Sequence, residues 1–213
     1  MEEAKWNLAP GDIETRSMAI IDHQVGPHDW PPESWQVVRR MIHTTADFEW
    51  ARITLVSPDA LASGKEALGR GCTIFTDTQM ARMGISAWRL EPLGARVRCL
   101  IGQEAVKWRA ADAGTTRAVA AMDLAVGLDP EAVFVVGNAP TALLRLLQHA
   151  QAGRARPALV VGLPVGFVNA AEAKQALARS DLPFITAQGP KGGSAVAASA
   201  LNALAILAAE EVS

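Results

Sequence analysis

The sequence predicts a doubly wound α/β fold, in which a mainly parallel sheet carries helices on both faces. From about residue 72 onward, short apolar runs rich in β-branched residues alternate with helical stretches. Most residues of these runs are apolar, as in strands that are covered on both faces. The chain has 213 residues, which suits one sizeable core, and we expect residues 1–213 to form a single domain.

The first 70 residues differ from the rest of the chain. Pro31 and Pro32 open a helix that runs through Met41, and an apolar stretch follows at residues 53–56. We expect this portion to pack against the sheet as an N-terminal helical extension of the same domain.

The remaining elements alternate regularly. Strands are expected at residues 72–76, 97–101, 132–136, 158–161 and 183–186. Helices are expected at residues 115–126, 141–152, 170–178 and 194–209. Because right-handed crossovers place helices over both faces of a parallel sheet, we predict a flavodoxin-like domain with five strands.

Composition excludes several classes of protein. The formal net charge of −2 gives no overall attraction to nucleic acid or to an anionic membrane. Cys72 and Cys99 lie in apolar runs, and Met1-Glu2-Glu3 does not resemble a signal peptide, so we expect reduced thiols and a cytoplasmic location. The alanine-rich segment 194–209 is interpreted as a buried or dimer-facing helix, and no membrane span is predicted.

The loop at residues 188–194 is the strongest indication of an anion site. Ligands of open parallel sheets bind beyond the carboxyl ends of the strands, where loops lead into helices. Gly192 and Gly193 let the backbone approach a ligand, the next helix presents free N–H groups, and Lys191 adds a positive charge. The spacing matches neither a Walker loop nor a G-x-G-x-x-G motif. A tight strand-to-helix turn explains the two glycines equally well.

His43 is the candidate for proton transfer. It lies near the expected end of a helix, and Arg40 and Thr44 are close to it in sequence. An imidazole can donate and recover a proton at neutral pH. A capping or surface role is nevertheless the commoner one for a histidine near a helix end. No metal-ligand spacing links His43 to the other histidines or to the cysteines, so no metal site is predicted.

Carboxylates occur at two further positions. Asp47 and Glu49 are two residues apart and would not face each other on a helix, so we interpret them as a helix cap and a solvated side chain. Asp77 follows a predicted strand and has a better claim to a ligand site, although an N-cap is the commoner role. No G-x-S-x-G motif is present, and no covalent nucleophile is predicted.

Seven segments together resemble the precorrin-8X methylmutase family, which includes the cobalt-precorrin-8 methylmutases. They span nearly the whole chain, and their order and number make the resemblance specific. They are I-E-x-x-S-M-x-I-I (13–21), I-H-T-T-A-D-F-E (42–49), T-D-T-x-M-x-x-x-G-I (76–85), T-T-R (115–117), V-G-N-A-P-T-A-L (136–143), G-L-P-V-G-F-V-N-A-A-E (162–172) and K-G-G-S (191–194).

The resemblance implies an isomerase of cobalamin biosynthesis. Such an enzyme moves a methyl group from C-11 to C-12 of the macrocycle, converting precorrin-8X to hydrobyrinic acid or cobalt-precorrin-8 to cobyrinic acid. It implies that His43 is the catalytic acid/base, that no cofactor is needed, and that the protein works as a homodimer. The residues expected around the substrate are Arg16, Ser17, Arg40, Thr44, Asp77, Gly84, Ile85, Arg117, Asn138, Lys191, Gly192 and Gly193.

Two other functions stay open at this point. The same pocket would serve a non-catalytic protein that holds a corrinoid for delivery. The Lys191 loop would also suit a flavodoxin-like protein that binds a nucleotide or a phosphate.

Overall fold

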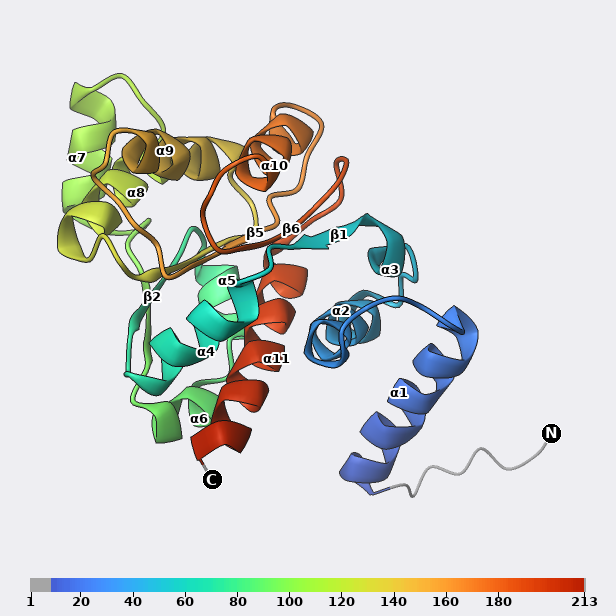
Figure 1. Cartoon of the computed structure of the whole chain (residues 1–213). Helices are drawn as coiled ribbons and strands as arrows, with labels where there is room; N and C mark the ends of the chain where they lie inside the picture. The colour runs from blue at the N-terminus through green and yellow to red at the C-terminus, as the bar shows by residue number, and fades with distance from the viewer. Residues whose placement is uncertain (1–8, 213) are drawn as a thin grey trace.

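The computed structural model describes residues 9–212 and shows one six-stranded sheet between two layers of helices (Figure 1). The strand order is β1-β6-β5-β4-β2-β3. The strands are β1 (Thr54–Val56), β2 (Thr73–Thr76), β3 (Arg96–Cys99), β4 (Val133–Val136), β5 (Leu159–Gly162) and β6 (Phe184–Ala187).

Helices cover both faces of this sheet. Figure 1 shows α7 to α10 on one face, whereas α2, α4, α5 and α11 lie on the other, with α1 beyond α2. The helices are α1 (Pro10–Val25), α2 (Pro32–Thr45), α3 (Trp50–Ile53), α4 (Ala60–Gly69), α5 (Gln79–Gly84), α6 (Ala87–Leu90), α7 (Glu104–Asp112), α8 (Arg117–Leu128), α9 (Pro140–Gln151), α10 (Ala170–Ala178) and α11 (Ser194–Val212), and a 3₁₀ helix, η1 (Glu91–Leu93), follows α6.

The five predicted strands are confirmed, and their parallel order β3-β2-β4-β5-β6 is that of a flavodoxin-like domain. The strand count was wrong, because β1 adds a sixth strand, antiparallel to β6, at the edge of the sheet. The N-terminal portion is therefore not purely helical. A three-residue strand that pairs with a segment 133 positions away, Thr54 with Ala187, leaves little local signal. The helices α1, α3, α4, α5, α6 and α7 and the 3₁₀ helix η1 were also not predicted.

Each face of the sheet carries its own hydrophobic cluster. Phe134 of the central strand β4 is completely buried beneath α8 and α9, and Leu204 of α11 is completely buried on the other face. By length and composition α11 would pass for a membrane span, but 67% of residues 194–211 are buried inside the protein. It is therefore a core helix, as its alanine-rich sequence suggested.

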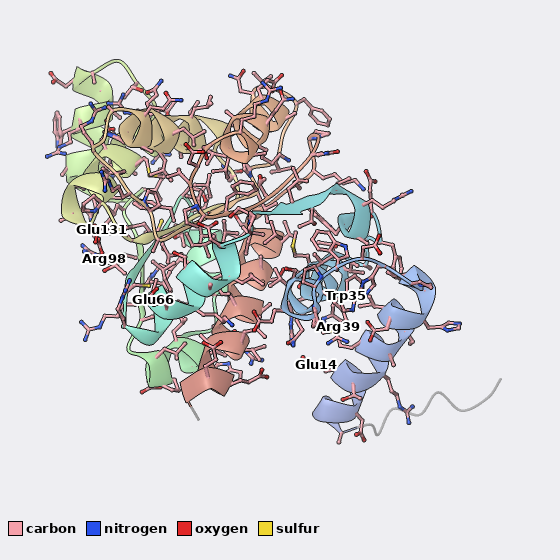
Figure 2. The ribbon with its side chains drawn as sticks, in the orientation of Figure 1. Glu14, Trp35, Arg39, Glu66, Arg98 and Glu131 are labelled. Atoms are coloured by element: carbon pink, nitrogen blue, oxygen red, sulfur yellow. The ribbon has the colours of Figure 1, made fainter. Side chains whose placement is uncertain are left out.

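The helix α1 is held to α2 by polar contacts. The Asp22 carboxylate accepts hydrogen bonds from Trp35 Nε1 and from the Arg39 guanidinium, both at 2.8 Å. Glu14 pairs with Arg40 at 2.6 Å. Figure 2 shows Glu14, Trp35 and Arg39 gathered where the two helices meet. These contacts fix the exposed side of α2, which carries the candidate His43.

The two cysteines are free, and both are half-buried. Burial raises the pKa of the Cys72 thiol to about 11, so this group stays protonated at neutral pH. Cys72 therefore has the character of a packing residue.

Candidate functional site

Asp77 closes the topological switch point between β2 and β4, where flavodoxin-like folds bind ligands. Its carboxylate accepts hydrogen bonds from the backbone N–H groups of Gly137, Asn138 and Ala139, at 3.0, 2.8 and 2.7 Å. The side chain is 6% exposed. Burial raises the pKa of Asp77, while these three N–H groups oppose the shift. They precede α9, so Asp77 occupies the position that a bound phosphate would take.

The cavity that Asp77 lines at the switch point is too small for a ligand. The cavity that Asp77 shares with Phe75 and Leu100 measures about 10 Å³, which is room for at most one water molecule. A phosphate therefore cannot enter this cavity, and the three N–H groups that would bind it already donate to Asp77. The predicted role of Asp77 as a direct substrate contact is not supported by its geometry, because both carboxylate oxygens already serve the loop after β4.

The loops after β2, β4 and β6 are locked together beside Asp77. The hydroxyls of Thr78 and Ser194 lie 2.8 Å apart, and Thr78 also caps α5 by accepting from the Ala81 N–H at 3.0 Å. A Cβ atom on Gly137 would lie 2.6 Å from Ser194 Cα, so only glycine permits this approach. The edge of the sheet is thus preorganised before any ligand arrives.

Lys191 ties the loop before α11 to the segment that follows α2. Its ammonium lies 2.5 Å from an Asp47 oxygen and 2.6 Å from a Glu49 oxygen. The expected capping contact exists, because Asp47 accepts a hydrogen bond from the Glu49 N–H at 3.0 Å just before α3. Our interpretation nevertheless missed that both carboxylates pair with Lys191. Ala46 ends α2 in the left-handed region (φ 52°), which turns the chain so that Asp47 and Glu49 face the same cation. The hydrogen bond to Lys191 lowers the pKa of Asp47.

The glycine pair serves the packing of two loops. The Gly193 N–H donates to the Leu163 carbonyl at 2.9 Å. A Cβ atom on Gly192 would lie 2.3 Å from that same oxygen and 2.5 Å from the Pro164 carbonyl oxygen. The strand-to-helix turn that we considered as an alternative is therefore present, and it seats the Lys191–Gly193 segment on the loop after β5.

His43 lies exposed on the last turn of α2, and Thr44 beside it is exposed as well. Within residues 9–212 the imidazole makes no hydrogen bond or ion pair. The Lys191 ion pairs hold the carboxyl end of α2 at the edge of the sheet where the parallel strands end. His43 is therefore neither sealed in the core nor remote from the loops at the strand ends.

A second group of predicted residues lies along α1 and α2. Arg40 is one turn before His43 and pairs with Glu14 of α1. Arg16 is exposed on α1, and the neighbouring Ser17 hydroxyl donates to the Ile13 carbonyl at 2.8 Å. Arg16, Ser17 and Arg40 thus place cationic and hydroxyl groups on α1 and on α2, the helix that carries His43.

Gly84 and Ile85 lie against α11. A Cβ atom on Gly84 would lie 2.9 Å from Ala198 Cβ. Asn202 of α11 donates to the Gly84 carbonyl and accepts from the Ser86 N–H, each at 2.9 Å. Ile85 is 4% exposed, so only a small part of its side chain can meet a ligand.

Arg117 and Asn138 lie at the starts of α8 and α9. Arg117 begins α8 behind its cap Thr116, and the Thr116 hydroxyl lies 3.5 Å from that of Thr141 in α9. The side chains of Arg117 and Asn138 are both exposed. Because α8 and α9 cover one face and α2 the other (Figure 1), the chain does not bring Arg117 next to His43.

Trp88 and Arg89 were not predicted as site residues, because no local sequence pattern distinguishes them. The Arg89 guanidinium stacks 4.1 Å from the centre of the Trp88 ring, which is 65% exposed. Burial lowers the pKa of Arg89, and the neighbouring charge of Arg40 lowers it further. Arg89 therefore adds a second cation near Arg40.

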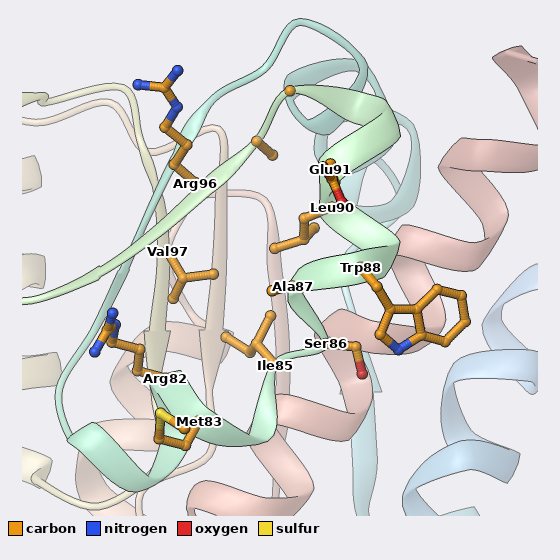
Figure 3. Close-up of a pocket in the computed structure, with 12 residues that line it drawn as sticks. Arg82, Met83, Ile85, Ser86, Ala87, Trp88, Leu90, Glu91, Arg96 and Val97 are labelled. Carbon is orange, nitrogen blue, oxygen red and sulfur yellow. The ribbon is translucent and has the colours of Figure 1, made fainter.

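A cavity of about 740 Å³ opens between β3 and the α5–α6 segment (Figure 3). Its floor includes Ile85, Leu90 and Val97, and Trp88 is turned away from the strand that carries Val97. His43 does not line this cavity. Within the described part of the chain, no three His, Cys, Asp or Glu side chains are grouped as metal ligands.

Known proteins resemble the chain over most of its length. The precorrin-8X methylmutase family model matches residues 12–207. A cobalt-precorrin-8 methylmutase from Salmonella typhimurium is 47% identical over 92% of this chain and 94% of its own length. One from Priestia megaterium is 43% identical over 94% of this chain and 89% of its own length. The crystal structure of a precorrin-8X methylmutase from Thermus thermophilus matches with a TM-score of 0.87 and 44% identity, covering 93% of this chain and 98% of that one.

Removal of the Asp77 carboxylate should destabilise the fold strongly. Asp77→Ala leaves three N–H groups without their acceptor, at about 1–3 kcal/mol for each group that stays unsatisfied. We expect the free energy of unfolding in urea to fall by about 3 kcal/mol or more. In the control Asp129→Ala, a more accessible carboxylate is removed, and a single N–H group, that of Glu131, loses its acceptor. The free energy of unfolding should then fall by only about 1 kcal/mol. Equal losses would contradict the role assigned to Asp77.

The Lys191 ion pairs should stabilise the fold in a pH-dependent manner. The folded state lowers the pKa of Asp47, so this stabilisation is present above the ordinary pKa of an aspartate and is lost as the pH falls through the lowered value. We expect Lys191→Met to be less stable than wild type at neutral pH, and the gap to close in acid. Thermal unfolding across pH measures this, with Lys107→Met on α7 as the control. A gap that widens in acid would refute the assignment.

Proposed function

Because the chain belongs to the precorrin-8X methylmutase family, and so is an isomerase of cobalamin biosynthesis, we propose that it moves a methyl group from C-11 to C-12 of precorrin-8X or cobalt-precorrin-8. The product is hydrobyrinic acid or cobyrinic acid. The position of His43 carries the proposal: the imidazole is exposed on a helix whose end the Lys191 ion pairs hold beside the strand ends.

His43 acts as the acid/base in this proposal. It donates a proton to the macrocycle, the methyl group migrates in the protonated ring, and the proton returns to the imidazole, so that substrate and product are isomers. The shift needs no nucleophile and no electron carrier. We propose accordingly that no cofactor takes part.

The substrate has an apolar ring fringed with carboxylates, and its site needs separated cations and hydrogen-bond donors. We propose that Arg16, Ser17 and Arg40 meet this fringe on the α1–α2 side. Arg40 and Lys191 already have carboxylate partners, but both pairs are partly exposed, so a substrate carboxylate can join or replace those partners. Thr44, Arg117 and Asn138 are exposed and complete the proposed donors.

The glycines and Asp77 support the site indirectly in this proposal. Asp77, Gly192 and Gly193 fix the loops at the strand ends, and Gly84 with Ile85 presents backbone groups from a segment held on α11. They shape the surface that the substrate meets.

We further propose that residues 1–213 form one domain and work in the cytoplasm as a homodimer. All strands among residues 9–212 belong to one sheet, and the family match spans residues 12–207. Apolar side chains remain exposed, among them Phe167 at 97%, Val168 at 77% and Ile20 at 57%. Such side chains favour burial in an interface. A second copy would also let residues that lie apart in one chain, such as His43 and Arg117, contribute to one ligand site.

Substitution of His43 tests the reaction. His43→Ala should lower the rate of methyl migration by about 10²–10⁴-fold, the usual contribution of a positioned acid/base. Absorbance spectra of the purified protein with precorrin-8X and with its cobalt form follow the conversion. The control His23→Ala removes an exposed histidine of α1 and should leave the rate unchanged.

The same measurement separates an enzyme from a carrier. A wild-type chain that binds hydrobyrinic acid tightly but converts no substrate would favour the non-catalytic corrinoid-binding function. Normal turnover by His43→Ala would refute the assigned role of His43.

The dimer is tested by mass. Light scattering coupled to size exclusion should give twice the 22.5 kDa of one chain. A mass of one chain at micromolar concentration would refute the homodimer.

A further inference from the structure

A buried lysine beneath the loop that carries Lys191 has no role in the proposed chemistry. Lys174 lies on α10 and is 0% exposed. Its ammonium donates a hydrogen bond to the backbone carbonyl of Lys191. No carboxylate of residues 9–212 forms an ion pair with it. Burying an ammonium without a counter-ion is unfavourable, so Lys174 does not serve to stabilise the fold through its charge.

The acceptor of this hydrogen bond lies at the centre of the loop before α11. The Lys191 side chain pairs with Asp47 and Glu49 after the His43 helix, while its carbonyl faces Lys174. The next two residues pack on the loop after β5, where Gly193 donates to Leu163. A single residue, Lys191, therefore links α10 to the segment that follows α2.

We propose that Lys174 is a positioning residue that holds the loop before α11, and with it the end of the His43 helix, in the geometry that methyl migration needs. The proposal rests on the proposed function and deepens it. Lys174 touches neither the ring nor its carboxylates; it acts through the Lys191 carbonyl. A charged donor makes a stronger hydrogen bond to a carbonyl than a neutral amine does.

The charge of Lys174 depends on pH in a range where the protein can be assayed. Burial lowers the pKa of Lys174 to about 8, so the ammonium is charged below that value and becomes neutral above it. The charged groups on the neighbouring elements have other partners: Arg145 and His149 of α9 engage Asp123, and the Lys191 ammonium engages its two carboxylates. The residues of β6, Phe184–Ala187, carry no charge, and Lys191 is the only charged residue at positions 188–193 in the loop that follows.

The test combines two measurements on the whole protein. The chain has only five lysines, at positions 5, 65, 107, 174 and 191, so NMR of the lysine ε-CH₂ groups can resolve each one. The signal that disappears in Lys174→Met should titrate near pH 8. The backbone amide signals of Gly192 and Gly193 should move with the same midpoint, because that loop is what Lys174 holds.

The second measurement is the pH profile of kcat/KM. In wild type we expect a fall of about tenfold or more as the pH rises through the Lys174 midpoint, since small misplacements at an active site can cost about a hundredfold. Lys174→Met should show the low value at all pH and lack this step, whereas Lys107→Met, an exposed lysine of α7, should keep the wild-type profile. Circular dichroism confirms that each variant is folded.

The outcomes separate this proposal from the proposed function. Coupled titration of Lys174 with the Gly192 and Gly193 amides in a protein without methylmutase activity would support the loop contact and refute the function. An active enzyme whose pH profile is the same in wild type and Lys174→Met would refute the positioning role. A Lys174 signal that titrates above pH 10, like an ordinary lysine, would overturn it as well.

Discussion

The ion pairs of Lys191 with Asp47 and Glu49 are the contacts on which the candidate site depends. They join two segments 144 and 142 positions apart in sequence, one after the helix of His43 and one before α11. Without them α2 would still pack on α11 through its apolar face, but its carboxyl end would have no charged contact with the sheet edge. Exposed ion pairs contribute little to stability. In the proposed function they matter for orientation, because an acid that protonates a ring must stand at a fixed place.

The fold uses its topological switch point in an unusual way. Flavodoxin-like sheets bind ligands between the loops of the two strands that flank this point, yet here the Asp77 carboxylate takes the N–H groups that would hold an anion. The substrate of a methylmutase is a wide macrocycle with carboxylates around its rim, and a narrow phosphate cradle would not suit it. Closing the cradle with a side chain leaves a rigid edge. In the proposed function, exposed groups such as His43 and Asn138 meet a large ligand beside it.

Stability and function place opposite demands on the loops at this edge. The close approach at Gly137 and Gly192 and the buried carboxylate of Asp77 all order backbone. Lys174 is different, because its buried ammonium destabilises the folded state while it fixes the Lys191 carbonyl. Natural proteins accept such local costs at functional sites. The unfavourable burial of Lys174 is therefore consistent with its proposed role in positioning the loop before α11.

The sequence by itself determined the five parallel strands and the helices α2 and α8 to α11, because mostly apolar runs repeat with amphipathic or apolar helical segments between them. It also determined His43 as the proton-transfer candidate, through the resemblance that residues 42–49 help to carry. Only the tertiary structure decided that β1 joins the sheet and that Asp77 serves the backbone. It alone decided that Asp47 and Glu49 meet Lys191. Each of these depends on segments more than 50 residues apart, and local patterns of hydropathy contain no information on which distant groups will meet.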